Sequence, residues 1–197
     1  MGANVSFLNE LRRKSVHFLA LSIPIGYYLI PEKNISLLIL VPITFVSIIV
    51  DIIRLRKLPG VNTLYLILGP MLRRRERFNF TGSTYILFGS VMSILFFNKR
   101  VAIAAISFII LGDIAAALIG KTFGRIKLGR RKTLEGSLAF LGICFVVAVI
   151  VHFVTGLDLR IGLIGAFVAT LVENLTLLVD DNVTVPLLSG LVMQLLI

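Results

Sequence analysis

Seven apolar runs, separated by short polar or charged turns, follow one another along this 197-residue chain. A helix of roughly 20 apolar residues spans the hydrocarbon core of a bilayer. Hydrophobic residues make up 57% of the chain, and its mean hydropathy is +1.00. The runs are continuous, whereas the strands of a membrane β-barrel alternate apolar and polar residues. The sequence therefore predicts an all-α fold: a polytopic transmembrane helical bundle that forms one domain over residues 1–197.

The predicted spans differ in length and in their breaks. They cover about 16–30, 35–53, 85–97, 101–119, 138–153, 161–179 and 183–197. Pro24 is expected to kink the first span, because proline removes a helical hydrogen bond. Residues 61–72 are apolar but too short to cross a core about 30 Å thick, so we expect them to form a helix in the membrane interface. Cys144 lies inside an apolar run, and a single cysteine gives no disulfide framework.

The distribution of charge predicts how the chain is oriented. The net charge is +10, which in a membrane protein points to loop topology, anionic lipid or a phosphorylated ligand rather than to nucleic acid. With seven spans and a cytoplasmic N-terminus, 16 cations lie inside and 4 outside, whereas a crossing by residues 61–72 would give 9 and 11. The positive-inside rule therefore favours seven spans. We expect an integral protein of the cell membrane or an ER-type membrane.

Most of the polar motifs fall at the predicted cytoplasmic end. Asp113 and Glu173 are acids inside apolar spans, where a charge costs ~2.5–3.5 kcal/mol at the membrane centre, so each needs a partner. Carboxylates beside many cations suit a Mg²⁺-nucleoside triphosphate, because acids hold the metal while Lys and Arg hold the phosphates. The candidate ligands for Mg²⁺ are Asp113, Glu135, Glu173, Asp180 and Asp181.

Two motifs near the N-terminal half have alternative interpretations. Glu10, Arg13, Lys14 and His17 share one helical face, either as a snorkelling membrane anchor or as part of a site. The Thr-Gly-Ser-Thr sequence of residues 81–84 either caps the third span or turns its hydroxyl and N–H groups toward a phosphate.

The fourth span carries small residues at every fourth position: Gly112, Ala116, Gly120 and Gly124. Such a seam allows another helix to approach closely. Residues 115–122 also satisfy a loose Walker A pattern, but a P-loop is a glycine-rich loop that follows a strand. Here the pattern falls on the end of an apolar helix, whose N–H groups are already bonded, so a P-loop is not expected.

Five motifs in this order resemble the CTP-dependent lipid kinases, the family of dolichol kinase, phytol kinase and the CTP-dependent diacylglycerol kinase. The motifs are Arg13-Lys14 with His17, Glu76 with residues 81–85, the seam from Gly112-Asp113 to Gly124, residues 132–137, and residues 180–186. The resemblance implies transfer of the γ-phosphate of CTP, with a divalent metal, to the hydroxyl of a membrane alcohol. A polyprenol, phytol or diacylglycerol would be the acceptor.

The resemblance also implies roles for single residues. Asp113, Glu135 and Asp181 are the expected catalytic residues, with Asp113 as the group that orients or deprotonates the lipid hydroxyl. Glu76, Asn182 and Thr184 complete the polar site. The expected nucleotide- or phosphate-binding residues are Arg13, Lys14, His17, Thr81, Gly82, Ser83, Gly112, Gly120, Lys121, Arg125, Lys132, Thr133, Gly136 and Ser137.

Two other functions remain open at this point. The stretch from Asp113 to Gly136 is also similar to part of the phosphatidate cytidylyltransferases, which transfer CMP from CTP. That family usually has Ser-Pro before Lys-Thr, where this chain has Arg130-Arg131, and the ending of residues 180–186 is similar to the kinases. A transporter would place polar sites near mid-bilayer between inverted repeats, and this chain has no visible repeat.

Overall fold

The computed structural model describes residues 18–57, 76, 78–128, 132–175 and 179–197. All regular elements among these residues are helices, which confirms the all-α fold. They are α2 (Ser22–Leu29), α3 (Lys33–Leu55), α5 (Gly82–Phe96), α6 (Lys99–Thr122), α7 (Leu134–Thr155), α8 (Leu159–Asn174) and α9 (Asp181–Leu195). Helices α3, α6 and α7 are long and apolar enough to cross a membrane, and α5 is a shorter apolar helix.

The helix bounds follow the predicted spans with two clear differences, at the end of α8 and at the start of α2. Helix α8 ends at Asn174, whereas the span was predicted to continue to residue 179, so Glu173 lies in the last turn rather than about two turns inside. Near Pro24, which has no N–H, the carbonyl of Ala20 accepts a bond from the N–H of Ile23 instead (3.0 Å), and the helix is interrupted before Ser22. The predicted interfacial helix at 61–72 lies outside the described residues.

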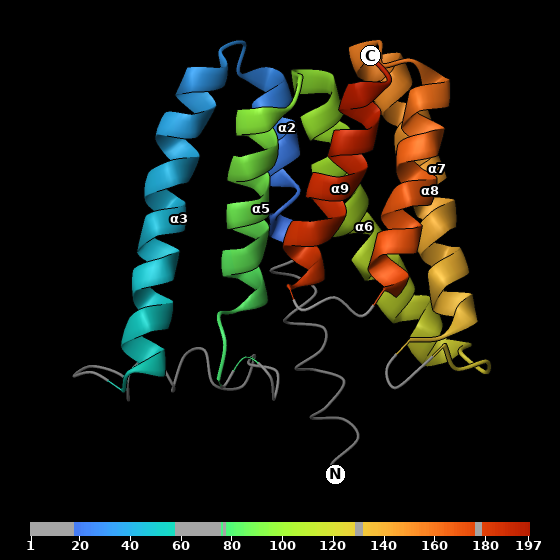
Figure 1. Ribbon diagram of the computed structural model, residues 1–197, viewed down its shortest axis with the longest axis horizontal. Helices are drawn as coiled ribbons and strands as arrows, with labels where there is room; N and C mark the ends of the chain where they lie inside the picture. The colour runs from blue at the N-terminus through green and yellow to red at the C-terminus, as the bar shows by residue number, and fades with distance from the viewer. Residues whose placement is uncertain (1–17, 58–75, 77, 129–131, 176–178) are drawn as a thin grey trace.

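Successive helices run in opposite directions, so their ends gather at two levels (Figure 1). Helices α3, α6 and α8 end, and α5, α7 and α9 begin, at the level that we call the basic end. Its described cations are Arg54, Arg56, Lys57, Lys121, Arg125, Lys127 and Lys132. The turns at 30–32, 97–98 and 156–158 lie at the opposite end. The grouping of the polar motifs at one end of the bundle is therefore present in the fold.

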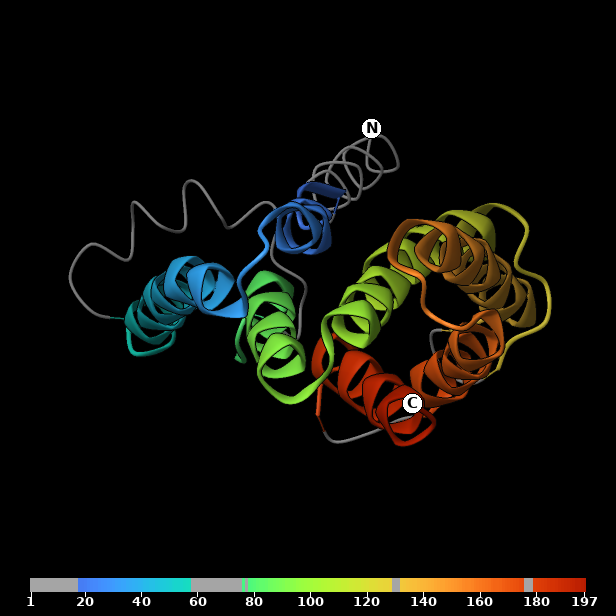
Figure 2. The ribbon, with the colours of Figure 1, turned by 90° about the horizontal axis from the view of Figure 1, so that it is seen from above.

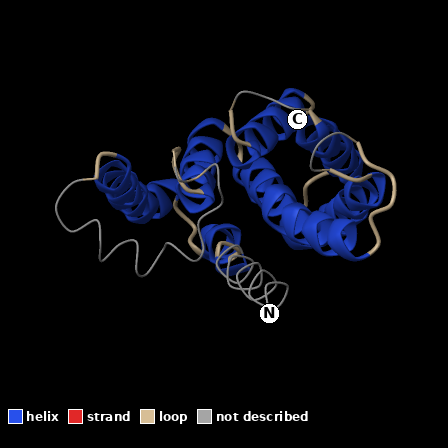
Figure 3. Cartoon of the chain, turned by 90° about the horizontal axis from the view of Figure 1, so that it is seen from below, coloured by secondary structure: helices blue, strands red, loops and turns tan. Residues whose placement is uncertain are grey.

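Viewed along the bundle, α6, α7, α8 and α9 form a closed ring of four helices (Figures 2 and 3). Helix α5 packs on the outside against α9 and α6, α3 packs against α5, and α2 packs against α6. The first half of α6, Val101 to Ile110, is completely buried and forms the centre of the core. Helix α3 leaves most of its apolar surface exposed, as expected for a helix that faces lipid.

The small-residue seam of α6 is the contact surface for α7, as predicted. A Cβ atom on Gly112 would lie 2.5 Å from the ring of Phe140. A Cβ atom on Gly120 would lie 3.0 Å from Thr133 Oγ1, and one on Gly136 would lie 3.0 Å from the carbonyl oxygen of Ala116. Backbones that approach this closely leave no room for larger side chains. The seam therefore fixes the start of α7 against the end of α6.

Candidate active site

Acidic residues from α6 and from the start of α9 lie close together at the basic end. The side chain of Asp180 caps α9 by accepting the N–H of Asn182 (3.2 Å), and it also accepts the Asn182 side-chain amide (2.7 Å). Asp181 follows in the first turn, before the apolar part of α9. Burial, Asp180 and Asp113 raise the pKa of Asp181, and Lys132 lowers it. Asp113 and Lys132, both far from Asp181 in sequence, thus act on it electrostatically.

Lys132 connects this acidic group to the end of α8. Its ammonium lies 2.8 Å from Glu173 Oε1 and also donates to the backbone carbonyl of Glu173. The other carboxylate oxygen of Glu173, Oε2, is buried and has no hydrogen-bond partner among the described residues. Close by, Ser137 donates to the side-chain oxygen of Asn174 (2.6 Å). Leaving a carboxylate oxygen buried without a hydrogen-bond donor costs folding free energy. Glu173 Oε2 could therefore accept a cation or a donor group of a ligand.

Glu135 holds the basic loop onto α7. Its carboxylate accepts the backbone N–H groups of Arg125 (2.9 Å) and Ile126 (3.2 and 3.3 Å). Two backbone bonds, Leu128 N–H to Lys132 O and Leu134 N–H to Ile126 O, close the loop on itself at 2.9 Å each. The geometry therefore gives Glu135 a positioning role in the loop, beside the catalytic role predicted for it.

Thr133 caps α7 by accepting the N–H of Gly136 (3.2 Å), so it too is part of the local structure. Lys121 lies in the last turn of α6, and both Lys121 and Arg125 are exposed at the basic end. Residues 115–122 are helical to their end at Thr122, which confirms that the Walker-like pattern is not a P-loop. Gly112 lies under the ring of Phe140, a packing position that gives no support to a direct contact with nucleotide.

The sequence 81–84 begins α5 in the capping arrangement. Thr81 accepts the N–H of Thr84, and its own N–H is bonded to Asp51 Oδ2 (2.8 Å). The N–H of Gly82 is bonded to Glu76 Oε1 (3.1 Å). The N-cap interpretation is thus confirmed, and a phosphate would have to compete with two carboxylates for these N–H groups. Binding of phosphate by Thr81, Gly82 and Ser83 remains a prediction.

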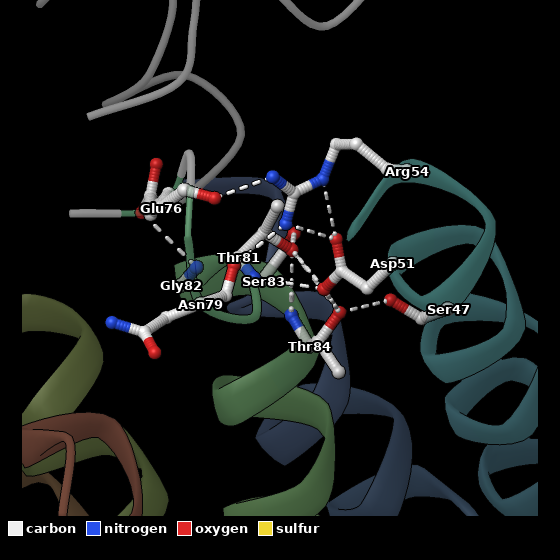
Figure 4. Close-up of polar contacts among 9 residues, drawn as sticks. All are labelled: Ser47, Asp51, Arg54, Glu76, Asn79, Thr81, Gly82, Ser83 and Thr84. Atoms are coloured by element: carbon white, nitrogen blue, oxygen red, sulfur yellow. Dashed lines mark hydrogen bonds and ion pairs between the residues drawn. The ribbon is translucent and has the colours of Figure 1, made fainter. Parts of the chain in front are cut away.

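Asp51 and Arg54 were not predicted as site residues, but they form a densely bonded polar cluster at the basic end (Figure 4). Both residues are 1% exposed, and at the end of α3 Arg54 Nη2 lies 2.9 Å from Asp51 Oδ1. The sequence signal that could have revealed the cluster is a pair of opposite charges, spaced i and i+3, at the end of an apolar span. The predicted contributors Arg13, Lys14 and His17 lie outside the described residues.

The acids at the basic end offer carboxylate oxygens, which are the donors that Mg²⁺ prefers. Within the described part of the chain, no group of three or more His, Cys, Asp or Glu side chains is arranged to hold a metal. Mg²⁺ commonly takes one or two carboxylates and completes its shell with phosphate oxygens and water. Asp181 and the unpartnered oxygen of Glu173, both of which have Lys132 as a neighbour, could supply one or two such carboxylates. A metal that arrives with a triphosphate is compatible with this end of the bundle.

Comparisons with known proteins place the chain among enzymes of known class. It is 30% identical to the CTP-dependent diacylglycerol kinase 1 of Eremothecium gossypii, over 96% of this chain and 68% of that protein. It is 32% identical to the protein of the same name from Saccharomyces cerevisiae, over 74% of this chain and 59% of that protein. A segment of 67 residues is 39% identical to the dolichol kinase of S. cerevisiae, covering 34% of this chain and 12% of that kinase.

No protein-family profile matches the chain, and no solved structure matches it. The match to the first relative extends over almost all of this chain. The resemblance seen in the five motifs is therefore confirmed by a match over the full bundle. The chain belongs to the family of the CTP-dependent lipid kinases.

Proposed function

We propose that this protein transfers the γ-phosphate of CTP to the hydroxyl of a membrane lipid alcohol, with Mg²⁺. The observation that carries the proposal is the meeting of Asp113, Asp181 and Lys132 at the basic end of a bundle that belongs to this family. The relatives are named for diacylglycerol and dolichol, both alcohols with long apolar chains. We place the site on the cytoplasmic side, as the loop charges predict.

In the proposed reaction the lipid oxygen forms a bond to the γ-phosphorus of CTP. The bond between that phosphorus and the β–γ bridging oxygen breaks, CDP leaves, and the hydroxyl proton passes to a carboxylate. Asp113 is the proposed acceptor of the proton, because it lies on the helix that forms the centre of the bundle and acts on Asp181. Lys132 and the basic loop would neutralise the triphosphate, and positioning would supply most of the rate.

Mg²⁺, when bound, would neutralise charge on the transferred phosphoryl group. Asp181 and Glu173 are the residues that we propose to hold it, together with phosphate oxygens and water, while Asp113 accepts the proton. Asp180 fixes the backbone of Asp181 by capping α9. Lys132 is engaged by Glu173 in the structure. A triphosphate that attracts Lys132 would release the Glu173 carboxylate toward a cation.

A membrane-fraction assay tests this function. Membranes that contain the protein are given γ-labelled CTP with diacylglycerol, a polyprenol or phytol, and the lipid fraction is counted. The proposal predicts label in the phosphorylated form of at least one alcohol, lost when the metal is chelated. Unlabelled CTP should compete better than unlabelled ATP. No transfer to any of the alcohols would contradict the proposal.

A further inference from the structure

The end of α3 is joined to the start of α5 by a buried charge pair whose hydrogen-bonding groups are nearly all used (Figure 4). Asp51 Oδ1 accepts two bonds from the guanidinium of Arg54, at 3.1 and 2.9 Å. Asp51 Oδ2 accepts the N–H and hydroxyl of Thr81, at 2.8 and 3.1 Å, and the hydroxyl of Thr84, at 2.7 Å. Thr84 is also bonded to Ser47 of α3 (2.6 Å).

Arg54 uses its remaining N–H groups on the backbone that leads into α5. It donates to the carbonyl of Glu76 and, at 2.7 Å, to the carbonyl of Asn79. A buried ion pair is weak evidence for stability, because packed apolar residues often replace it without loss. Here one guanidinium fixes two separate carbonyls, so the contacts specify where Glu76 and residues 78–84, the segment before and at the start of α5, lie.

This fixed segment lies against α9 beside the proposed active site. A Cβ atom on Gly82 would lie 3.3 Å from Glu76 Oε1 and 3.6 Å from Asn182 Nδ2. About two turns farther along α5, Gly89 lies directly against the backbone of Asn182 and Val183. Asn182 in turn bonds to Asp180. A continuous set of contacts therefore leads from Arg54 through Glu76 and Gly82 to the acids at the start of α9.

We infer that Asp51 and Arg54 are positioning residues of the reaction: they hold Glu76 and residues 78–84 against Asn182 so that the start of α9 meets the metal–triphosphate end of CTP. The inference rests on the proposed function. Neither residue needs to touch a substrate, since both side chains are almost completely buried. Displacing a group that orients reactants by about 1 Å can cost about 100-fold in rate.

The kinetic test compares Arg54→Lys and Arg54→Met with the wild type, purified in lipid nanodiscs and matched for folded protein. Lysine keeps the charge beside Asp51 but cannot bond both carbonyls in a planar arrangement. We expect KM for CTP to rise at least tenfold and kcat/KM for CTP to fall about 100-fold, with KM for the lipid within twofold of the wild type. A loss of folded protein alone would lower the apparent kcat without raising KM for CTP.

Arg100→Met is the matched control. Arg100 also donates to a backbone carbonyl, that of Gly156 (3.1 Å), but at the opposite end of the bundle. This variant should leave both KM values unchanged. If Arg54→Lys and Arg54→Met behave like Arg100→Met, the inference is overturned.

A second measurement follows the position of the segment without using activity. In a Cys144→Ala background, we expect Gly82→Cys and Asn182→Cys to form a disulfide, because a Cβ atom on Gly82 would lie 3.6 Å from the side-chain nitrogen of Asn182. Adding Arg54→Met should slow its formation at least tenfold. An unchanged rate would overturn the inference. If the wild type transfers no phosphate from CTP, the proposed function fails and this inference falls with it. If the wild type and the Arg54 variants are equally active, only the inference fails.

Discussion

Lys132 and Glu173 show how one contact can combine stability and function. The Lys132 side chain is 29% exposed and that of Glu173 is 12% exposed, so the carboxylate is the more deeply buried partner. Burying an unpaired charge is costly, whereas a neutral amide of the same shape is tolerated better. Removing one charge of the pair should therefore destabilise the protein more than removing both charges.

Lys132→Met should lower the free energy of unfolding by about 1–3 kcal/mol, less than the 3–5 kcal/mol typical of a fully buried pair, because Lys132 is partly solvated. Adding Glu173→Gln should recover most of the loss. Denaturant unfolding in detergent measures both. Equal stability of the single variant and the wild type would contradict this interpretation of the pair.

Asp113 carries the clearest catalytic prediction at this scale. Asp113→Asn should lower kcat by about 10²–10⁴-fold, the range expected for loss of a general base, while the protein remains folded. Asp158→Asn is the control, because Asp158 caps α8 at the opposite end and asparagine caps equally well. Full activity of Asp113→Asn would remove Asp113 from the mechanism.

At the scale of helices, the contact between α6 and α7 sets the position of the basic loop. Gly112 is covered by the ring of Phe140, and Gly120 and Gly136 face Thr133, the residue that caps α7. Close packing of small residues replaces the hydrophobic effect as the force between helices in lipid. The position of the loop that bears Arg125 and Lys132 therefore depends on this helix contact.

Gly112→Ala should destabilise the protein by about 1–3 kcal/mol, because its methyl group would overlap the Phe140 ring. Combining it with Phe140→Leu should recover part of the loss. Gly142→Ala, on α7 with nothing within 4 Å, should be neutral or stabilise by up to about 1 kcal/mol. Thermal unfolding in detergent distinguishes the two glycines, and equal effects would show that the seam is not tightly packed.

For the whole molecule, the ends of the helices divide the polar groups between two levels, and the acidic group that includes Asp113 and Asp181 belongs to the basic end. Single-cysteine labelling in a Cys144→Ala background tests which level faces the cytoplasm. Lys127→Cys should react with an impermeant reagent in inside-out vesicles, and Glu32→Cys in right-side-out vesicles. Both positions are exposed. The reverse pattern would put the site on the outer side.

The sequence predicted the helical class, the alternation of the helices and the seam, because apolar runs and small-residue spacing are local signals. It also predicted that Asp113 and Asp181 belong to one end, through the count of loop charges. It did not predict that α8 ends at Asn174, since no breaker follows Glu173 directly. Nor did it predict the cluster around Asp51 and Arg54, because the partners of these side chains include backbone groups that are 22 to 30 residues away in sequence.

The most direct test of the central claim is the position of the label that reaches the lipid. Purified protein in nanodiscs is given the lipid alcohol with either γ-labelled or α-labelled CTP. Transfer of the terminal phosphoryl group predicts that γ-label enters the lipid and that α-label stays in the released CDP. Entry of α-label into the lipid would show transfer of CMP and would contradict the account.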